Sequence, residues 1–227
     1  MILIRAEIAP LSVSPIFFEK NHSILSYMTT SSPNSLCRSL DVRKEQPIVL
    51  QKELMHGYRI SVRPVCIHTD DDINAIHEWL SDGYPRTTGL PVDQLRVFFI
   101  LLAESTYAQA FMVLLNDDTP IGQFEVYQVL QDELNNSIDA GEGDYRIYVP
   151  VMPVIALFPD ITEQIVQTCL HYIFSCSEVK RLFWVIPVND KERMKVAAQT
   201  GFQLLKSLRE VTIDGDLPAH VYQCTRS

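Results

Sequence analysis

The 227-residue sequence is short of glycine, of positive charge and of closely paired cysteines. Its net charge of −9 and pI near 5.1 leave no basic surface that would neutralise phosphates, so we expect no nucleic-acid partner. The five cysteines are odd in number and widely spaced, which predicts reduced thiols rather than a metal or redox site. Arg5 and Glu7 interrupt the apolar start, which therefore lacks the unbroken length that spans a bilayer. These absences predict a cytoplasmic protein with no metal and no membrane partner.

Glycine is missing from one long stretch, between Gly143 and Gly201, and Lys and Arg are missing between Arg146 and Lys180. Loops that bind a diphosphate present backbone N–H groups at a helix N-terminus, where the helix dipole also favours anions. The segment MPVIALFPD instead offers two prolines without N–H donors, no glycine, and a carboxylate at Asp160. We therefore expect this segment to be a poor site for a diphosphate.

With 47% hydrophobic and 21% charged residues, the chain can bury a sizeable core. We assign residues 56–227 to one domain and residues 1–55 to an N-terminal arm or extension that is partly irregular. From Tyr58 onward, the spacing of apolar residues predicts the order β-α-α-β-β-β-α-β-α-β-β. The predicted strands cover residues 58–65, 108–115, 121–130, 144–151, 181–188, 204–213 and 219–225. This order predicts an α/β (α+β) protein with helices packed on a mixed sheet.

The helix ends carry recognisable signals. The first helix follows residues 70–72, three aspartates that suit the cap and dipole of a helix N-terminus. A later helix over residues 161–176 has Asp160 as its predicted cap, and Glu163 would complete a capping box. The last helix ends at Gly201, a natural left-handed C-cap.

Two prolines follow the strand that precedes the 161–176 helix. Pro150 and Pro153 cannot donate ladder hydrogen bonds, so we expect neighbouring strands to part there. The element order resembles the GNAT acyltransferase fold, in which central strands splay apart and acyl-CoA lies in the opening. The resemblance covers residues 58–224, and it implies a mixed, mostly antiparallel sheet with splayed central strands and helices on both faces.

A narrower resemblance rests on the segment TPIGQFEVYQVLQDELNNSIDAGEGDYRIYV. It is similar to the siderophore-type N-acyltransferases, such as the N-hydroxylysine acetyltransferase of aerobactin synthesis. The matching residues are Pro120, Ile121, Gly122, Phe124, Glu125, Tyr127, Asp144 and Ile147, with His171 and Tyr172 on the following helix.

The sequence departs from this motif at two places besides the glycine-free loop. Tyr148 stands where the motif would have its catalytic histidine. A phenol has a reference pKa of about 10, against about 6.5 for imidazole, so it is a poor general base near neutrality. The segment WVIPVNDKERM resembles the family's Glu-Pro-Asp-x-x-Asn segment through Pro187, Asn189 and Asp190, but Asp190 is one register away from the catalytic aspartate.

The resemblance implies N-acyl transfer from acetyl-CoA or another acyl-CoA to a small amine or hydroxylamine, in siderophore biosynthesis. Glu125 would be the base, Tyr148 an acid or pocket residue, and Tyr127 a wall of the acceptor pocket. The residues expected to bind acyl-CoA are Val149, Val151, Ile161, Thr162, Asn189 and Arg193. The acidic surface favours a cationic or amine-bearing partner, although acidity that serves solubility alone is the simpler explanation. A homodimer is compatible with the sequence.

Plainer alternatives exist for each of these residues. Glu125 could be an exposed strand residue or a structural hydrogen-bond acceptor, and Tyr127 an ordinary sheet tyrosine. His171 is more easily explained as a structural histidine than as a catalytic one. Cys66 and His68 share a strand face, yet two ligands do not make a zinc site.

Two other functions compete with transfer from acyl-CoA. A degenerate GNAT-fold binding or interaction module without CoA-dependent catalysis would account for both the missing glycine-rich loop and the missing histidine. An acyltransferase that uses an acyl carrier protein would need no diphosphate site, although its donor would still present a phosphopantetheine.

Overall fold

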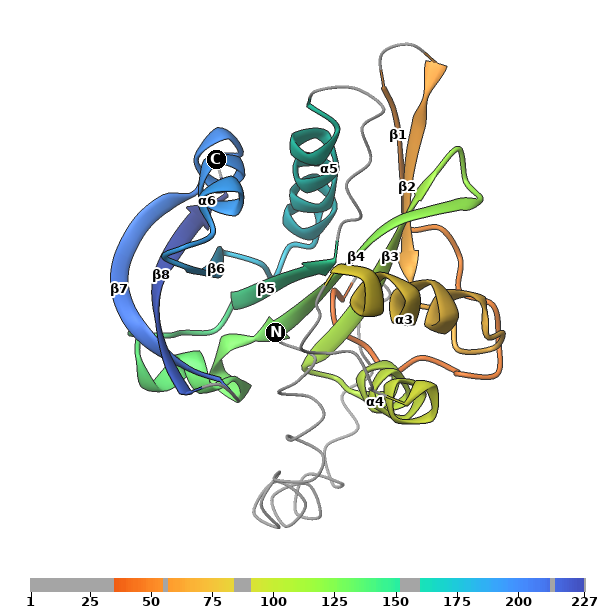
Figure 1. Cartoon of the computed structure of the whole chain (residues 1–227), viewed down its shortest axis with the longest axis horizontal. Helices are drawn as coiled ribbons and strands as arrows, with labels where there is room; N and C mark the ends of the chain where they lie inside the picture. Colours follow the sequence, from red (N-terminus) through yellow and green to blue (C-terminus); the bar gives the residue numbers. More distant parts are fainter. Residues whose placement is uncertain (1–34, 55–56, 84–90, 152–159, 213–214, 227) are drawn as a thin grey trace.

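The computed structural model describes residues 35–54, 57–83, 91–151, 160–212 and 215–226 (Figure 1). Within these ranges, eight strands form one sheet in the order β1-β2-β3-β4-β5-β6-β8-β7. Neighbouring strands are antiparallel except β5 and β6, which are parallel. The strands are β1 (Leu50–Glu53), β2 (Arg59–Pro64), β3 (Ala108–Leu115), β4 (Thr119–Gln128), β5 (Asp144–Val151), β6 (Arg181–Pro187), β7 (Gln203–Thr212) and β8 (Gly215–Thr225). The helices are α3 (Asp71–Gly83), α4 (Val92–Glu104), α5 (Ile161–Ser175) and α6 (Lys191–Gln199), with short 3-10 helices η2 (Val129–Gln131) and η3 (Glu133–Asn136).

The predicted order of strands and helices is confirmed from β2 to β8, and so is the mixed, mostly antiparallel sheet. One additional strand, β1, lies within the segment assigned to the N-terminal arm and pairs with β2. Leu36 is fully buried in the core cluster that the sheet forms with helix α5. Described residues 35–54 therefore pack with the domain, while the boundary at residue 55 stays a prediction.

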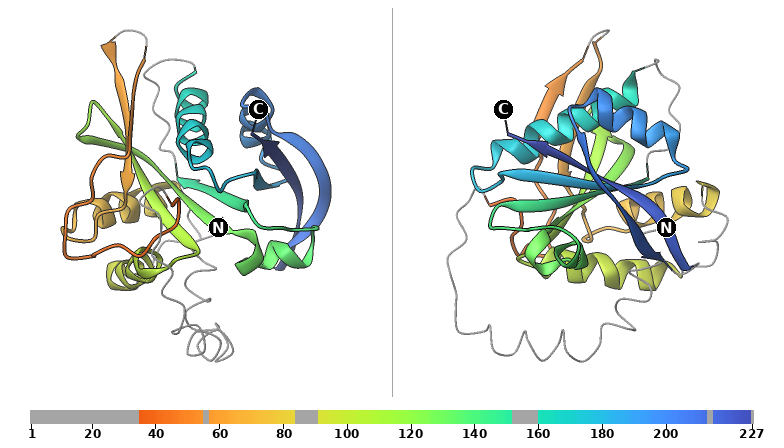
Figure 2. Two further views of the ribbon diagram at one scale, coloured as in Figure 1. Left: turned by 180° about the vertical axis from the view of Figure 1, so that it is seen from behind. Right: turned by 90° about the vertical axis from the view of Figure 1, so that its left-hand side faces the viewer.

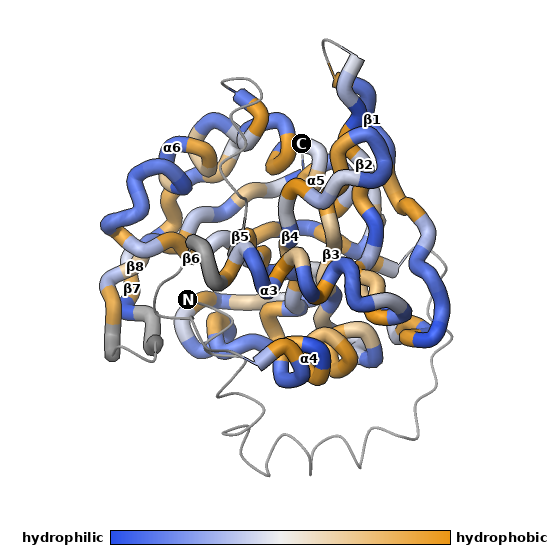
Figure 3. Tube along the Cα trace, turned by 45° about the vertical axis from the view of Figure 1, so that its right-hand side comes forward, coloured by the Kyte–Doolittle hydropathy of each residue, from blue (hydrophilic) through white to orange (hydrophobic). Residues whose placement is uncertain are grey.

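Helices cover both faces of the sheet, as Figures 1 and 2 show. Helices α5 and α6 lie on one face, over a core cluster that includes Phe124 and Ile165. Helices α3 and α4 lie on the other face, over a second cluster that includes Ile76 and Phe99. The hydropathy colours in Figure 3 alternate along α4, as expected of a helix with one buried side. A third, smaller cluster joins η2 and η3 to β6 and β8.

The parallel pair β5–β6 parts before its strands end. Pairing runs from Asp144 opposite Arg181 to Ile147 opposite Trp184, and then stops. Both strands continue, β5 to Val151 and β6 to Pro187. The predicted splay of the central strands is thus present. The last β5–β6 pair is at Ile147, three residues before Pro150. Pro153 lies outside the described residues.

One predicted helix signal is wrong and another is confirmed. Asp160 precedes α5, but its side chain makes no capping hydrogen bond, because its φ of −110° and ψ of 14° are not the extended geometry of a capping residue. Glu163 accepts a hydrogen bond from Gln167 instead of closing a capping box. Gly201, after α6, has the predicted left-handed conformation with φ +93°.

The aspartates at the start of α3 do more than complement its dipole. Asp72 is buried and binds the guanidinium of Arg63 through two hydrogen bonds of 2.6 and 2.8 Å. It also accepts a hydrogen bond of 2.7 Å from the backbone N–H of Cys66. This carboxylate therefore ties the start of α3 to the end of β2, which the prediction of simple capping did not include.

Gly143 leads into β5 in a conformation that requires glycine. Its φ is +91°, and an added Cβ would lie 2.6 Å from the backbone oxygen of Glu178. Its carbonyl accepts hydrogen bonds from the N–H groups of Lys180 and Arg181. This contact sets the starting register of the parallel pair β5–β6.

We expect Gly143→Ala to lower the free energy of unfolding by about 1–3 kcal/mol, because alanine would be strained at this φ and would crowd Glu178. Urea unfolding followed by circular dichroism measures the change. Gly141→Ala is the matched control, since a Cβ at Gly141 meets nothing within 4 Å. Equal stability of the two variants would contradict the proposed role of Gly143.

Candidate active site

A group of polar and aromatic side chains lies in the middle of the sheet, on the face covered by α3 and α4. Gln123, Glu125 and Tyr127 alternate along β4, and Arg146 and Tyr148 alternate along the neighbouring strand β5. Residues two apart on a strand point to the same face, and Glu125 pairs directly with Tyr148. We call these five residues the polar group.

Glu125 is the centre of the polar group. Its side chain is 1% exposed, yet it carries a carboxylate. One oxygen accepts a hydrogen bond of 3.0 Å from the Gln123 amide, and the other accepts one of 2.6 Å from the Tyr127 hydroxyl. Burial raises the pKa of Glu125 above the ordinary glutamate value, although both hydrogen bonds act in the opposite direction. A buried carboxyl of this kind can exchange protons nearer neutrality than an exposed one.

Two tyrosines and an arginine lie next to one another beside Glu125, Tyr127 on β4 and Tyr148 and Arg146 on β5. Burial, and then the charge of Glu125, raise the pKa of Tyr127 well above its ordinary value, so this phenol remains a hydrogen-bond donor. The rings of Tyr127 and Tyr148 meet edge to face with centroids 5.2 Å apart. The guanidinium of Arg146 lies 4.0 Å over the Tyr148 ring and forms an ion pair of 3.0 Å with Asp132. Tyr148 is thus held between an aromatic edge and a cation.

The polar group separates two apolar clusters on this face. Tyr127 packs at the edge of the cluster under α3 and α4. Beyond Arg146 lies the cluster of η2, η3, β6 and β8, which contains Phe183. Helix α3 contacts both β4 and β5. A group of buried polar residues between two apolar clusters marks a candidate binding or catalytic site.

A β-bulge lies beside the polar group. Gln123 pairs with Val151, and Glu125 pairs with Tyr148, so β5 has one more residue than β4 between these pairs. The same part of β5 has no pairing with β6 in the described structure. Its backbone therefore has groups available to a ligand on the side that faces β6.

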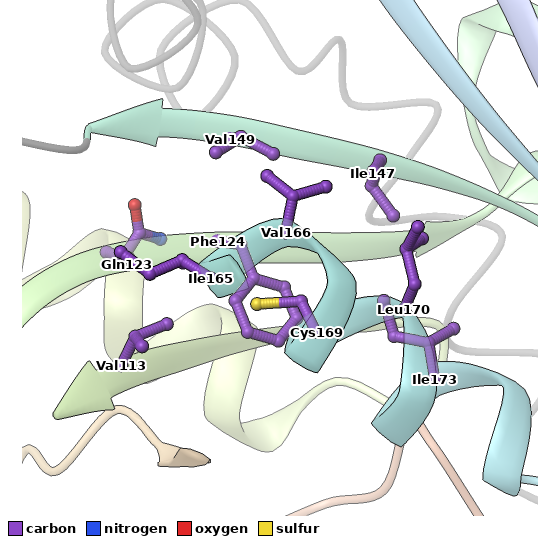
Figure 4. Close-up of a pocket in the computed structure, with 10 residues that line it drawn as sticks. All are labelled: Val113, Gln123, Phe124, Ile147, Val149, Ile165, Val166, Cys169, Leu170 and Ile173. Carbon is purple, nitrogen blue, oxygen red and sulfur yellow. The ribbon is translucent and has the colours of Figure 1, made fainter. Parts of the chain in front are cut away.

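A small cavity lies on the opposite face, between α5 and strands β3 to β5 (Figure 4). Its lining is apolar except for Gln123, which borders this cavity as well as bonding Glu125 of the polar group, and includes Phe124, Val149, Val166 and Cys169. The cavity volume of about 10 Å³ is at the lower limit for one water molecule. It is a gap in the packing and cannot hold a ligand of ordinary size.

The predicted catalytic and substrate-binding residues lie together, whereas the residues predicted to bind acyl-CoA lie in different parts of the fold. Glu125, Tyr127 and Tyr148 belong to the polar group. Val149 and Ile161 have buried side chains in the core under α5, so only their backbone groups could serve a ligand. The side chain of Val151 lies outside the description, and its backbone pairs with Gln123.

The remaining predicted residues lie at helix starts. Thr162 is half-buried in the first turn of α5, and Asn189 is exposed before α6. Asp190 caps α6 by accepting a hydrogen bond of 3.0 Å from the Arg193 N–H, and its other oxygen lies 3.4 Å from the Arg193 guanidinium. Arg193 therefore already has a carboxylate partner. The segment MPVIALFPD lies outside the described residues except for Asp160.

Three other sequence interpretations can be compared with the structure. His171 is exposed on α5, so it is neither a buried structural histidine nor part of the polar group. Cys66 is buried whereas His68 is exposed, so the two do not share an environment. All five cysteines lie in the described residues as free thiols, as predicted. No helix among the described residues has the length and apolar composition needed to cross a membrane.

The sequence interpretation missed Gln123, Arg146 and Asp132. The period of two along a strand was the available signal, since Gln123 and Arg146 each lie two residues before a residue already singled out. No comparable signal was available for Asp132, the ion-pair partner of Arg146. Asp132 comes from the polar loop after β4, and no local pattern indicates that it reaches β5.

Comparisons with known proteins give a family and a fold. The sequence matches the model of the acetyltransferase (GNAT) domain over residues 68–209, more than half of the chain. No protein among the curated ones matches. Among solved structures, an uncharacterised protein from Bacillus halodurans has a TM-score of 0.64 at 18% identity, covering 79% of this chain and 92% of its own.

Two further solved structures are enzymes. An aminoglycoside acetyltransferase in complex with coenzyme A and kanamycin has a TM-score of 0.60 at 18% identity, covering 74% of this chain and 95% of its own. A spermidine N-acetyltransferase from Vibrio cholerae in complex with CoA and spermine has a TM-score of 0.58 at 13% identity, covering 73% and 95%. At these identities, the similarity establishes the fold.

The raised pKa of Glu125 predicts a pH-dependent stability. In the unfolded chain this carboxyl titrates near its ordinary value of 4.5, and in the folded chain it titrates at a higher pH. Between these values the folded state holds one more proton, so its stability decreases as pH rises. We expect Glu125→Gln to gain stability relative to the parent protein as pH rises above about 4.5, up to the raised pKa.

Urea unfolding at a series of pH values measures this difference. Tyr127→Phe is the companion variant, because it removes a hydrogen bond that lowers the pKa of Glu125. The stability of Tyr127→Phe should therefore keep decreasing up to a higher pH than that of the parent protein. A constant stability difference between Glu125→Gln and the parent at all pH values would show that Glu125 has an ordinary pKa.

Proposed function

Because the chain belongs to the acetyltransferase (GNAT) family, we propose that it is an acyl-CoA-dependent N-acyltransferase that acts on a small amine or hydroxylamine. The observation that carries the proposal is the buried Glu125 carboxylate, bonded by Tyr127 and Gln123 beside the bulge in β5. Structural neighbours named for aminoglycosides and spermidine, with CoA bound, support an amine acceptor and a CoA donor.

In this proposal Glu125 is the general base. Its carboxylate takes a proton from the substrate ammonium, which frees the nitrogen lone pair to attack the thioester carbonyl carbon. The carbon–sulfur bond then breaks, and Tyr148 gives its proton to the departing sulfur. The Tyr148 phenolate takes back the proton that the new amide nitrogen loses, and Glu125 releases its proton to solvent. The raised pKa of Glu125 supports the role, because a stronger base removes the proton more readily near neutral pH.

The described residues suit part of acyl-CoA. The β5 backbone from Tyr148 to Val151 has no pairing with β6 in the described structure, so its N–H and C=O groups could bond an extended pantetheine arm. Thr162 and Asn189, at the starts of α5 and α6, remain the side chains proposed for the far end of the donor, with Ile161 contributing through its backbone. Arg193 would have to bind phosphate while it is shared with Asp190.

A role in siderophore biosynthesis is the narrower form of this proposal. It is supported by the motif from Pro120 to Tyr127, which includes Glu125 and Tyr127 of the polar group. The substrate would then be a lysine, ornithine or diamine derivative, with or without an N-hydroxyl group. A cytoplasmic location accompanies this role.

The second candidate is a GNAT-fold binding module that performs no transfer. Two observations favour it. Tyr148 replaces the motif's histidine, and Arg193, the basic residue proposed for phosphate, is paired with Asp190. Calorimetry with acetyl-CoA separates the two candidates, because the binding module should show no heat at millimolar cofactor while it remains folded.

We expect acetyl-CoA to bind and Glu125→Gln to lower kcat for thiol release by about 10²–10⁴-fold, as for loss of a general base. A thiol-release assay over lysine, ornithine and diamine derivatives, each with and without N-hydroxylation, measures this effect and identifies the acceptor. Glu142→Gln is the matched control, because Glu142 is an exposed glutamate just before the opposite end of β5. An unchanged rate in Glu125→Gln would eliminate Glu125 as the base.

A further inference from the structure

Arg146 is a buried charged side chain without a role in the reaction described above. It is 2% exposed, and its guanidinium carbon lies 4.0 Å from the centre of the Tyr148 ring. Tyr148 is itself 5% exposed, so solvent screens the contact between the two groups only weakly. A cation in such a place is costly, and the costly place it occupies is beside the proposed acid.

A carboxylate from the loop after β4 holds Arg146 in this position. Asp132 Oδ1 accepts a hydrogen bond of 3.0 Å from the guanidinium and one of 2.7 Å from the backbone N–H of Leu134. The carboxylate is thereby fixed at the start of η3, and it fixes the guanidinium in turn. The edge of Tyr127 holds the Tyr148 ring. Cation and phenol are therefore kept together by groups on three different elements.

The proposed reaction requires Tyr148 to ionise in this buried place. Its proton passes to the departing sulfur, and a phenolate remains. A thiol has a reference pKa of about 8.5 and a phenol one of about 10, so the transfer is unfavourable unless the phenolate is stabilised. An opposite charge within about 4–6 Å favours the charged form of an ionisable group. The guanidinium of Arg146 lies within that distance of the ring centre.

We propose that Arg146 is a positioning residue that stabilises the Tyr148 phenolate formed as the thiol leaves. This inference rests on the proposed function and adds a residue to its acid step. Arg146 keeps all its protons, while the phenol proton passes to sulfur and the phenolate takes one back from the new amide nitrogen. With this cation beside it, a tyrosine serves where the family motif has a histidine.

The negative charges near Tyr148 act against the phenolate. Glu125 pairs with Tyr148 across β4 and β5. In the proposed reaction Glu125 has already taken the proton of the ammonium ion, so its charge is absent when the sulfur leaves. Asp132 and Glu133 lie 3.0 and 3.6 Å from the guanidinium and offset part of its effect. Glu133 is the more exposed of the two, so solvent screens its charge more strongly.

The first test needs no acyl-CoA and follows the ionisation of Tyr148 itself. The full chain is grown with 3-fluorotyrosine and titrated by ¹⁹F NMR, and Tyr148→Phe assigns the signal. We expect the Tyr148 midpoint to rise by about one pH unit or more in Arg146→Met, and Arg146→Lys to restore most of it because the charge is kept. Charged groups elsewhere, including Asp72 and His77 on the neighbouring helix α3, are the same in all variants and cancel from the comparison.

Two results of this titration would overturn the proposal. One is an equal Tyr148 midpoint in the parent protein and in folded Arg146→Met. The other is a Tyr148 that does not ionise before the parent protein unfolds.

Arg181→Met is the matched control for the titration. Arg181 also lies over an aromatic ring, 5.3 Å from the centre of Phe183, and it also binds an aspartate, Asp144. It therefore has the same kinds of contact without a tyrosine beneath it. Its removal should leave the Tyr148 midpoint unchanged.

The second test is a double-mutant cycle of Arg146→Met and Tyr148→Phe on kcat for thiol release. We expect Arg146→Met to lower kcat about 10-fold with little change in KM, and to have no further effect in the presence of Tyr148→Phe. An equal loss in both backgrounds would assign Arg146 to the fold alone and overturn the proposal. Because Arg146→Met removes the ion-pair partner of Asp132, the cycle is repeated with Asp132→Asn in every member, and thermal melts show which variants are folded.

The two tests separate this inference from the proposed function. A midpoint shift in Arg146→Met, without acyl transfer by the parent protein, would support stabilisation of the phenolate and defeat the acyltransferase. Acyl transfer by the parent protein, without a midpoint shift in folded Arg146→Met, would support the acyltransferase and defeat the inference.

Discussion

The site depends on the burial of one carboxylate. Glu125 lies in the centre of the sheet, where an ion is costly, and among the described residues it accepts hydrogen bonds from Gln123 and Tyr127. The same burial that raises its pKa gives it the basicity that proton transfer requires. The edge-to-face contact with Tyr127 and the cation–π contact with Arg146 hold the Tyr148 ring in place on the neighbouring strand. In the proposed function, this carboxylate is the base that the polar group supplies.

Strand register brings these side chains together. The pairing of β4 with β5 puts Glu125 opposite Tyr148, and the bulge that follows shifts the end of β5 by one residue. The parallel pairing of β5 with β6 stops at Ile147, so the polar group lies next to backbone without a sheet partner in the described structure. Gly143 fixes where this pairing starts. The fold therefore places the proposed base, Glu125, beside a segment of β5 suited to an extended ligand.

The sequence predicted the elements well because each depends on local pattern. Alternation in β4 and the three- to four-residue spacing in α5 specify both elements without knowledge of their partners. Predictions that depended on side-chain direction were less reliable. The capping box failed because the backbone of Asp160 is not extended, and Asp72 binds Arg63, which no local signal indicates. Glu125, Tyr127 and Tyr148 were found through a family motif, whereas Gln123 was missed, although it lies two residues before Glu125 on the same strand.

The most direct test of this account is an NMR titration of the Glu125 side-chain carboxyl carbon, assigned by its loss in Glu125→Gln. We expect its midpoint to lie above the ordinary glutamate value of 4.5 and to move down when a small alkylamine is added, because an ammonium ion favours the charged carboxylate. A midpoint at the ordinary value that the amine does not move would contradict the account.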